Sequence, residues 1–287
     1  MSLMDEIITA VEEMPPFPQV VQRALQELSK PEYEVADLVD ILKVDQAVTA
    51  NILKLCNSAY FGLPRKVSSL KEAVVYIGSK QLRQLLFSGA VNKIYDRPNE
   101  GYAVFADELW RHALATAVMS QVLRRHLKLK LDDNEVFTAA LLHDVGKVVL
   151  SNFVAERYQR IDTLVETEGL SFQEAEKEVL GFDHAEIGGR IADKWDFPAE
   201  IISAIRWHHE PAGSEKPYRL LTELVALANT LTVMVGYGTG VDGLACHGHD
   251  LLLKKLQVKE RDLEELLLTF QMEMAKTCDI AGVGERE

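Results

Sequence analysis

Residues 141–147 read Leu141-Leu142-His143-Asp144-Val145-Gly146-Lys147 and place an imidazole beside a carboxylate in an otherwise apolar stretch. The apolar residues on both sides predict one largely buried helix over residues 133–152. On such a helix His143 and Asp144 would both face Lys147, at i, i+4 and i, i+3 spacing. A buried His–Asp pair has lost its hydration and requires hydrogen-bonding partners or a metal ion.

Further imidazoles are distributed along the chain. His112, His184 and the doublet His208-His209 lie at predicted helix ends or on apolar helices. A single histidine of this kind is more often a hydrogen-bonded core residue, but their number favours a metal centre held by several helices. Nitrogen and oxygen donors in this combination suit first-row transition metals, and the two oxygens of Asp144 could bridge two ions. The remaining histidines have polar neighbours and are predicted to lie on the surface: His126, His247 and His249.

The charge of the chain is unevenly distributed. Its 287 residues, of which 47% are hydrophobic, are enough for a large core, and the formal net charge is -13. Residues 1–100 hold 11 basic and 13 acidic residues, whereas the remainder holds 20 and 31, so the part with the histidines is the acidic one. An acidic surface attracts cations and repels polyphosphate backbones, so nucleic-acid binding is not expected. A local basic group is interpreted as a solvated helix face: Arg65, Lys66, Lys71, Lys80 and Arg83.

The cysteines and the hydropathy bear on the compartment. Cys56, Cys246 and Cys278 are far apart and form no CxxC pair, which argues against a disulfide framework or a cysteine zinc site and is consistent with a reducing cytosol. No apolar run reaches a membrane-spanning length, and no signal-peptide pattern is present at the N-terminus. We therefore expect a cytoplasmic protein without membrane segments.

Apolar residues recur with helical spacing along most of the chain, and no stretch alternates like a strand. The dense prolines of residues 15–18 end the first short helix. Asp37 and Asp45 are predicted N-caps of later helices, and Gly78 is a predicted helix end. Further helices are predicted over residues 80–92, 104–127, 154–168, 217–235 and 250–278.

Two helix ends are predicted to position histidines. Asp183 has the sequence context of an N-cap and places His184 in the first turn of its helix. Pro198 stands at the start of the next helix, and Pro211 ends it directly after the His208-His209 doublet.

The chain is predicted to be all-α and to form two lobes. Turn-forming residues between Tyr95 and Gly101 separate residues 1–98 from residues 99–287. The Gly-rich segment 236–248 is predicted to be a loop. Gly188-Gly189 lies within a predicted helix and would let another helix, or a ligand, approach closely.

The order His112, His143-Asp144, His184, His208-His209 resembles that of the ligands in the HD superfamily of metal-dependent phosphohydrolases. More narrowly, it resembles the HD-GYP branch, which hydrolyses cyclic dinucleotides, and residues 142–147 are similar to the HD-x-G-K segment of that branch. The resemblance implies Asp144 and Lys147 as catalytic residues, with Lys147 in contact with a substrate phosphate.

The N-terminal lobe resembles a sister group, the HDOD (HD-related output) domain. Residues 15–18, 45–62 and 67–70 carry this similarity, which extends over about residues 10–235. It implies an N-terminal HDOD-type lobe over residues 1–98 and an HD-like helical bundle with a C-terminal helix over residues 99–287. Members of this family usually occur in bacterial signalling proteins, and most have lost the metal ligands.

The chain departs from both families. The distal aspartate of an HD site falls at Asn229, and no GYP stretch follows His208-His209-Glu210. By resemblance, one ion would take His112, His143, Asp144 and Asn229, and the neutral Asn229 should weaken that site. A second ion would share Asp144 and take the remaining histidines, which are His184, His208 and His209.

Two functions therefore remain open. The first is a bacterial signalling or regulatory HDOD module with one or two divalent transition-metal ions, of which Fe or Mn is favoured and Ni or Zn is an alternative. Its partner would be a signalling protein or a small phosphorylated ligand. The second is a metal-dependent phosphohydrolase or phosphodiesterase that acts on a nucleotide or a cyclic dinucleotide. The sequence does not decide whether the protein is an enzyme.

Overall fold

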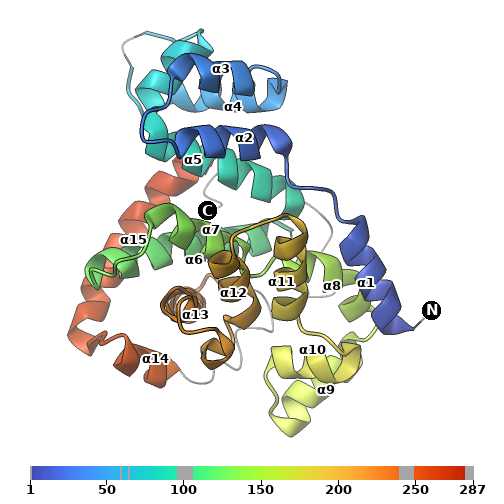
Figure 1. Cartoon of the computed structure of the whole chain (residues 1–287). Coiled ribbons are helices and arrows are strands. Elements are labelled where there is room, and N and C mark those ends of the chain that lie inside the picture. Colours follow the sequence, from blue (N-terminus) through green and yellow to red (C-terminus); the bar gives the residue numbers. More distant parts are fainter. Residues whose placement is uncertain (1, 59, 64, 96–105, 239–248, 282–287) are drawn as a thin grey trace. The chain divides into compact units, whose positions relative to one another are not determined.

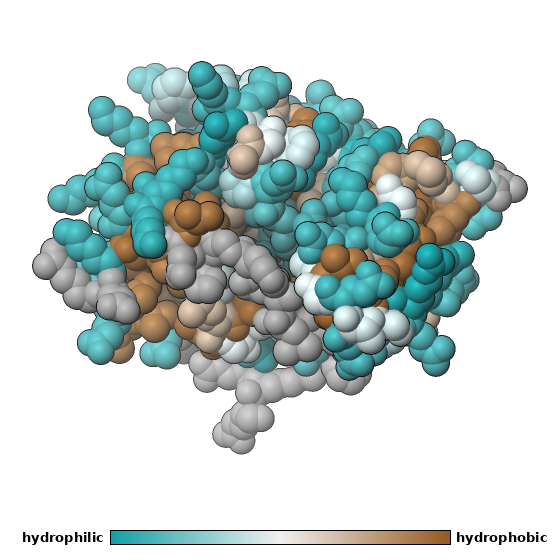
Figure 2. Space-filling model, turned by 90° about the horizontal axis from the view of Figure 1, so that it is seen from below, coloured by the Kyte–Doolittle hydropathy of each residue, from teal (hydrophilic) through white to brown (hydrophobic). Residues whose placement is uncertain are grey.

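The computed structural model describes residues 2–58, 60–63, 65–95, 106–238 and 249–281 (Figure 1). Throughout these ranges every regular element is a helix, so the predicted all-α class is confirmed. Each helix within them is too short or too polar to cross a lipid bilayer. Figure 2 shows a face that is mostly hydrophilic, with limited hydrophobic areas between the polar side chains.

The chain forms two compact units. Unit 1 consists of Met1–Pro15 and Ile94–Phe270, and unit 2 consists of Pro16–Lys93 and Gln271–Glu287. These units are defined by their internal contacts, whereas a domain is defined by independent folding. The predicted division into lobes at residue 98 therefore stays a prediction. The predicted boundary turn and most of the predicted loop 236–248 lie outside the described residues.

Unit 2 is built around the short helices that follow the prolines. They are α2 (Gln19–Leu28), α3 (Val35–Leu42), α4 (Gln46–Cys56) and most of α5 (Leu70–Tyr95). Asp45 caps α4 by accepting from the backbone N–H of Val48 at 3.0 Å, as predicted. The prediction for Asp37 is wrong, since α3 begins after Glu34 and Asp37 lies in its first turn, where a carboxylate is still favourable.

Two residues shape the end of α4 and the middle of α5. Gly78 has φ of +77° and interrupts the helical backbone of α5, which confirms the predicted helix end. Asn57 donates from Nδ2 to the carbonyl of Val67 and accepts from the Val67 N–H, both at 2.7 Å. The amide thus closes the connection between α4 and α5 in the way a backbone pair would.

Unit 1 is the larger helical bundle. Its elements are α1 (Leu3–Glu13), α6 (Ala106–His126), α7 (Asp133–Leu142), α8 (Gly146–Ala155), α9 (Tyr158–Glu168), α10 (Phe172–Leu180), α11 (His184–Lys194), α12 (Ala199–Trp207), η2 (Pro211–Gly213), α13 (Arg219–Met234), α14 (His249–Lys255) and the first half of α15 (Glu260–Ala281). Helix α6 packs on α7 and α13, and α11 packs on α8 and α12. The core therefore lies where these helices meet.

The N-terminal helix α1 is attached to the end of α11. Lys194 donates to the carbonyls of Val11 and Met14 at 3.2 and 2.8 Å, and Trp195 donates to that of Pro15 at 2.9 Å. These bonds satisfy carbonyls at a helix end that has no intrahelical partners. They explain why the first fifteen residues belong to unit 1.

The predicted continuous helix over residues 133–152 is wrong in one respect. It is two helices, α7 and α8, separated by a turn at residues 143–145. At the break the backbone forms tight i to i−3 bonds, from the Val145 N–H to Leu142 at 2.9 Å and from the Lys147 N–H to Asp144 at 3.0 Å. A Cβ at Gly146 would lie 1.9 Å from the carbonyl oxygen of His184, so the glycine lets α11 pack directly against the backbone that follows the break.

The predicted helix over residues 250–278 is also divided. It comprises α14 and α15, and Gln257, with φ of +59°, lies between them. A residue in the left-handed region cannot continue an α-helix, and a glutamine there is uncommon.

Candidate metal centre

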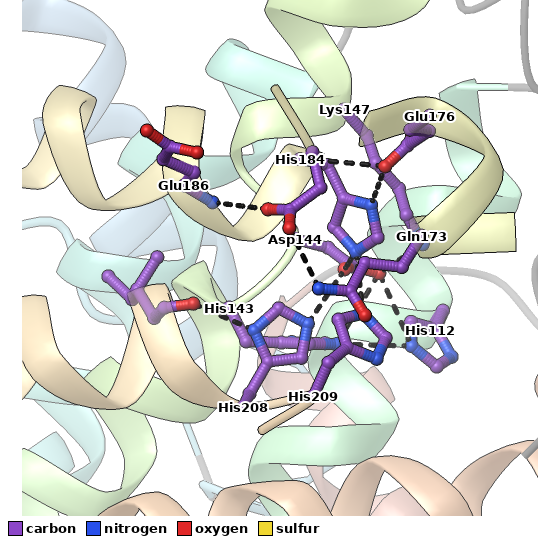
Figure 3. Close-up of polar contacts among 12 residues, drawn as sticks. His112, His143, Asp144, Lys147, Gln173, Glu176, His184, Glu186, His208 and His209 are labelled. Atoms are coloured by element: carbon purple, nitrogen blue, oxygen red, sulfur yellow. Dashed lines mark hydrogen bonds and ion pairs between the residues drawn. The ribbon is translucent and has the colours of Figure 1, made fainter. Parts of the chain in front are cut away.

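The predicted imidazoles converge on one carboxylate (Figure 3). Asp144 Oδ2 lies 3.5 Å from His112 Nε2 and 3.4 Å from His143 Nε2. Asp144 Oδ1 lies 3.4 Å from His184 Nε2 and 3.7 Å from His208 Nε2. All five residues are buried, with at most 2% of each exposed. The convergence expected from the sequence is thus present in the described structure.

The donor atoms fall into two groups, in each of which all atoms lie within 4.8 Å of one another. One group is His112, His143 and Asp144; the other is His184, His208 and His209. His209 is exposed, unlike the others, and its Nε2 lies 2.8 Å from His184 Nε2.

Backbone carbonyls fix the orientation of three rings. His112 Nδ1 lies 2.6 Å from the carbonyl oxygen of Tyr237. His143 Nδ1 lies 2.7 Å from the carbonyl oxygen of Ala140, and His208 Nδ1 lies 2.7 Å from that of Ile205. Because a carbonyl oxygen only accepts, each Nδ1 carries the proton and donates it. The lone pair of each neutral ring is then on Nε2, toward Asp144. This is the outer support that metal-binding histidines typically have.

His143 and His208 reach this orientation in the same way. Each is the residue that follows a helix, α7 or α12, and each bonds the carbonyl three residues earlier. A histidine at a helix end can turn back onto a carbonyl that has lost its helical partner. The helix ends therefore position the two rings.

His184 is held by a carboxylate instead. Glu176 on α10 is fully buried, and its Oε2 accepts from His184 Nδ1 at 2.6 Å and from the His184 backbone N–H at 3.0 Å. Burial alone would lower the pKa of His184, but the attraction of Glu176 outweighs it and raises the pKa to about 9.

Sequence reasoning missed Glu176. A signal was present, because Glu176 falls on the same face of its helix as Phe172, Ala175 and Leu180, all of which are buried. An acidic residue at a core-facing helical position is uncommon and requires a partner.

The protonation states of His143, His208 and Asp144 suit cation binding, whereas His184, with a pKa of about 9, must release the proton of Nε2 before an ion binds there. Burial lowers the pKa of His143 well below its usual value and lowers that of His208 to about 4. Burial would raise the pKa of Asp144, but the surrounding imidazoles and Lys147 hold it well below its usual range. Near pH 7, His143 and His208 are therefore neutral and Asp144 is ionised, which are the forms that bind a metal.

Two polar atoms at the centre are unsatisfied. Asp144 Oδ1 and His208 Nε2 are buried without a hydrogen-bond partner among the described residues. Buried acceptors that face one another are unfavourable unless a proton or a cation lies between them. The imidazole and carboxylate donors fit a divalent transition-metal ion. Asn229 Oδ1 on α13 is also buried without such a partner, but no hydrogen bond among the described residues joins Asn229 to Asp144, so its part in the ligand set stays a prediction.

Lys147 makes the contact with Asp144 that their i, i+3 spacing predicted. Its ammonium is buried, 3% exposed, and donates to Asp144 Oδ2 at 2.8 Å. Lys147 therefore neutralises the central carboxylate on the oxygen that faces His112 and His143.

Glycines allow the helices that hold the centre to approach one another. A Cβ at Gly188 would lie 2.9 Å from Ile205 Cγ2 and 3.3 Å from the nitrogen of Gly146. A Cβ at Gly189 would lie 2.8 Å from Arg206 Nε. The prediction that Gly188-Gly189 permits a close helix approach is confirmed, and α8, α11 and α12 meet there.

A polar hollow of about 580 Å³ lies between α10, α11 and α12. Its lining includes Gln173, which donates to the N-cap Asp183 at 2.7 Å, and the residues Trp207 and Glu210, which flank His208-His209 in the sequence. The hollow contains both acidic and basic side chains, so its charge alone selects no ligand.

Comparison with known families decides the relationship. The profile of the HDOD domain matches residues 14–211, which is more than half of the chain. The chain belongs to the HDOD domain family. The match includes α2 to α12 and all the converging imidazoles, but it ends before Asn229.

Similar proteins include an uncharacterized protein of Treponema pallidum (strain Nichols), which is 25% identical over 227 residues. The matched residues make up 79% of this chain but only 44% of that relative, so the chain spans less than half of the relative's length. An HDOD domain protein of unknown function from Geobacter sulfurreducens has a TM-score of 0.74 at 24% identity, with 97% of both chains covered.

A candidate signal transduction protein from Marinobacter aquaeolei VT8 has a TM-score of 0.74 at 18% identity, with 98% of this chain and 65% of that one covered. A candidate phosphohydrolase from Shewanella amazonensis SB2B has a TM-score of 0.69 at 23% identity, with 97% and 98% covered. At these identities the likeness of the structures establishes the fold alone.

Proposed function

We propose that this HDOD protein is a signal-transduction module that binds one or two divalent transition-metal ions around Asp144. The observation that carries the proposal is the inward orientation of the Nε2 atoms of His112, His143, His184 and His208, each held from behind through Nδ1. Iron or manganese suits this donor set best, with nickel or zinc as alternatives.

Each ligand would have a defined task. His112, His143 and Asp144, together with Asn229, would hold one ion, and His184, His208 and His209 would hold a second that shares Asp144. The ligands lie at the ends of α7, α11 and α12 and within α6. A change in the centre would therefore alter how these helices pack, and a partner could sense that change.

The partner would be a separate signalling protein or a small phosphorylated ligand. The candidate signal transduction protein among the similar structures supports a regulatory role by analogy of fold. The formal net charge of -13 argues against nucleic acid.

A second candidate function is a metal-dependent phosphohydrolase. The likeness to a candidate phosphohydrolase and the pairing of Lys147 with Asp144 favour it. Asp144 would hold the ions, and Lys147 would contact a substrate phosphate as in the HD-GYP branch. An ion at this centre would supply a Lewis acid and an activated water. The neutral Asn229 in place of a carboxylate and the missing GYP stretch weigh against turnover.

Metal analysis of the purified chain tests both functions. We expect bound transition metal in the wild type and at least a tenfold loss of affinity in Asp144→Asn, which keeps the shape of the side chain but removes its charge. The matched control is His126→Ala, which removes an imidazole that lies away from the centre, 3.8 Å from Asp262. A metal content that is unchanged in Asp144→Asn would contradict the metal centre.

Turnover assays then separate the two functions. The regulatory function predicts no hydrolysis of phosphomonoesters, nucleotides or cyclic dinucleotides by the metal-loaded chain. Hydrolysis that disappears in Asp144→Asn and in Lys147→Met, but persists in His126→Ala, would instead establish the phosphohydrolase.

A further inference from the structure

The two oxygens of Asp144 have different surroundings, and this difference extends the proposed metal centre. We define the His112 side as His112, His143 and Asp144 Oδ2, and the His184 side as His184, His208, His209 and Asp144 Oδ1. Among the described residues, an ammonium contacts the carboxylate oxygen of the His112 side alone, since Lys147 Nζ lies 2.8 Å from Oδ2. Within the same ranges Asp144 Oδ1 has no hydrogen-bond partner.

The fixed charges behind the imidazoles differ as well. His112 and His143 are backed by neutral carbonyl groups, those of Tyr237 and Ala140. His184 is backed by the carboxylate of Glu176, which is fully buried. A carboxylate behind a histidine raises the basicity of the nitrogen that faces the metal, and more so than a neutral group does.

We propose that the two sides bind metal ions unequally and in a fixed order, with the first ion on the His184 side. Glu176 is the positioning residue that makes this side the tighter one, and Lys147 opposes an ion on the His112 side. The proposal rests on the metal centre proposed above and adds which half of it is loaded first.

Charge and burial explain the order. The charge of Lys147 also acts on His184 and His208, but its ammonium contacts Oδ2, so an ion on the His112 side would compete with Lys147 for that oxygen, in surroundings where water screens charges poorly. Lys147 is 3% exposed and lies in the first turn of α8, so it cannot move into solvent without repacking. An ion on the His184 side lies opposite the open oxygen of Asp144 and gains the charge of Glu176. The two sides are therefore not equivalent, although both offer imidazole nitrogens and one shared carboxylate.

Titration of the metal-free 287-residue chain with Mn²⁺ tests this order. We expect two binding events by calorimetry, the second at least tenfold weaker than the first. Crystals grown with one equivalent of Mn²⁺ should show an anomalous scattering peak on the His184 side. A first peak on the His112 side, or two events of equal affinity, would overturn the proposal.

Two variants assign the difference to the named residues. Glu176→Gln keeps the size of the side chain and should weaken the first event by about 10- to 100-fold, which is typical for loss of an outer partner of a ligand. Lys147→Met should strengthen the second event at least tenfold and change the first one less. If Glu176→Gln leaves the first binding event unchanged and Lys147→Met leaves the second unchanged, Glu176 and Lys147 do not set the order.

Matched controls make the same chemical changes at exposed positions. Glu178→Gln on α10 and Lys54→Met on α4 should leave both events unchanged. Circular dichroism and thermal unfolding verify that each variant is folded. Absence of binding by Mn²⁺, Fe²⁺, Ni²⁺ and Zn²⁺ in the wild type and in every variant would overturn the metal centre itself, whereas equal affinities would overturn only the order.

Discussion

The cores of the two units differ in kind. In unit 2 the described core is made almost entirely of apolar side chains such as Val21, Leu38 and Ile52, and its one buried ionisable group, apart from the thiols, is Glu27, 8% exposed. Unit 1 buries several charged or titratable side chains, and the largest group of them surrounds Asp144. Replacing buried ionic groups by apolar ones is often neutral or stabilising. Polar residues concentrated in one core therefore point to a task other than stability.

The largest expected effect concerns the glycine at which α8 meets α11. Gly146→Ala places a methyl group 1.9 Å from a backbone oxygen, and neither helix can move away without separating Asp144 from His184. We expect a loss of about 3 kcal/mol or more in the free energy of unfolding, at the upper end of the range for overpacking. Urea unfolding measures it, and Mn²⁺ binding should be lost with it.

The matched change in unit 2 is Gly89→Ala. A Cβ there meets nothing within 4 Å, and Gly89 lies within helix α5. Alanine is the better helix former, so the variant should be neutral or stabilised by up to about 1 kcal/mol. If Gly146→Ala and Gly89→Ala lost a similar amount of free energy of unfolding, the close contact at Gly146 would be unimportant for stability.

The dependence of stability on pH should come from unit 1, because unit 2 contains no histidine. In folded, metal-free protein the pKa of His184 is raised to about 9, so its stabilisation is full below pH 6.5 and is lost as the pH rises toward 9. The pKa of His208 is lowered to about 4, so protonation of the unfolded chain removes stability as the pH falls from 6.5 toward 4. Thermal unfolding in a chelator should therefore show a maximum near pH 6.5.

The size of this pH effect on stability, and a control for it, follow from the same histidines. The alkaline arm of this curve amounts to about 3.5 kcal/mol at most, since one unit of pKa shift corresponds to about 1.4 kcal/mol, and the acid arm is larger because burial lowers the pKa of His143 as well as that of His208. Glu176→Gln should flatten the alkaline arm and leave the acid arm in place. An unchanged alkaline arm in this variant would assign it to other groups.

The sequence predicted the histidines that converge on Asp144 better than the contacts behind them. Its histidines are few, and the helix signals at Asp183, Pro198 and Pro211 placed them correctly at helix ends. The break between α7 and α8 was not predicted, because the apolar residues continue through it without a proline or another local stop signal, and the contact of α11 with Gly146 joins residues distant in sequence. Glu176 and Tyr237 were missed for a related reason, since partners distant in sequence are joined only by the fold.

Metal binding should stabilise the chain through unit 1 alone. Mn²⁺ at 100 times its dissociation constant should raise the free energy of unfolding by about 2.7 kcal/mol, because the unfolded chain lacks the site. The same shift should appear in Ile52→Val, a core change in unit 2 that lowers basal stability by about 1 kcal/mol. Thermal unfolding with and without Mn²⁺ gives both values, and Asp144→Asn should show little or no shift. A smaller shift in Ile52→Val would mean that the unit 2 core contributes to the metal site.

The smallest effect compares two aspartate N-caps. Asp45 caps α4 in unit 2 and accepts from Val48, whereas Asp183 caps α11 in unit 1 and accepts from Glu186 at 2.7 Å. Replacing either by alanine should cost about 1 kcal/mol, the usual value for an N-cap. Only Asp183→Ala should also weaken Mn²⁺ binding, because α11 begins with His184 and a frayed first turn moves that imidazole. Equal Mn²⁺ affinity in the two variants would show that Glu176 alone is sufficient to hold His184.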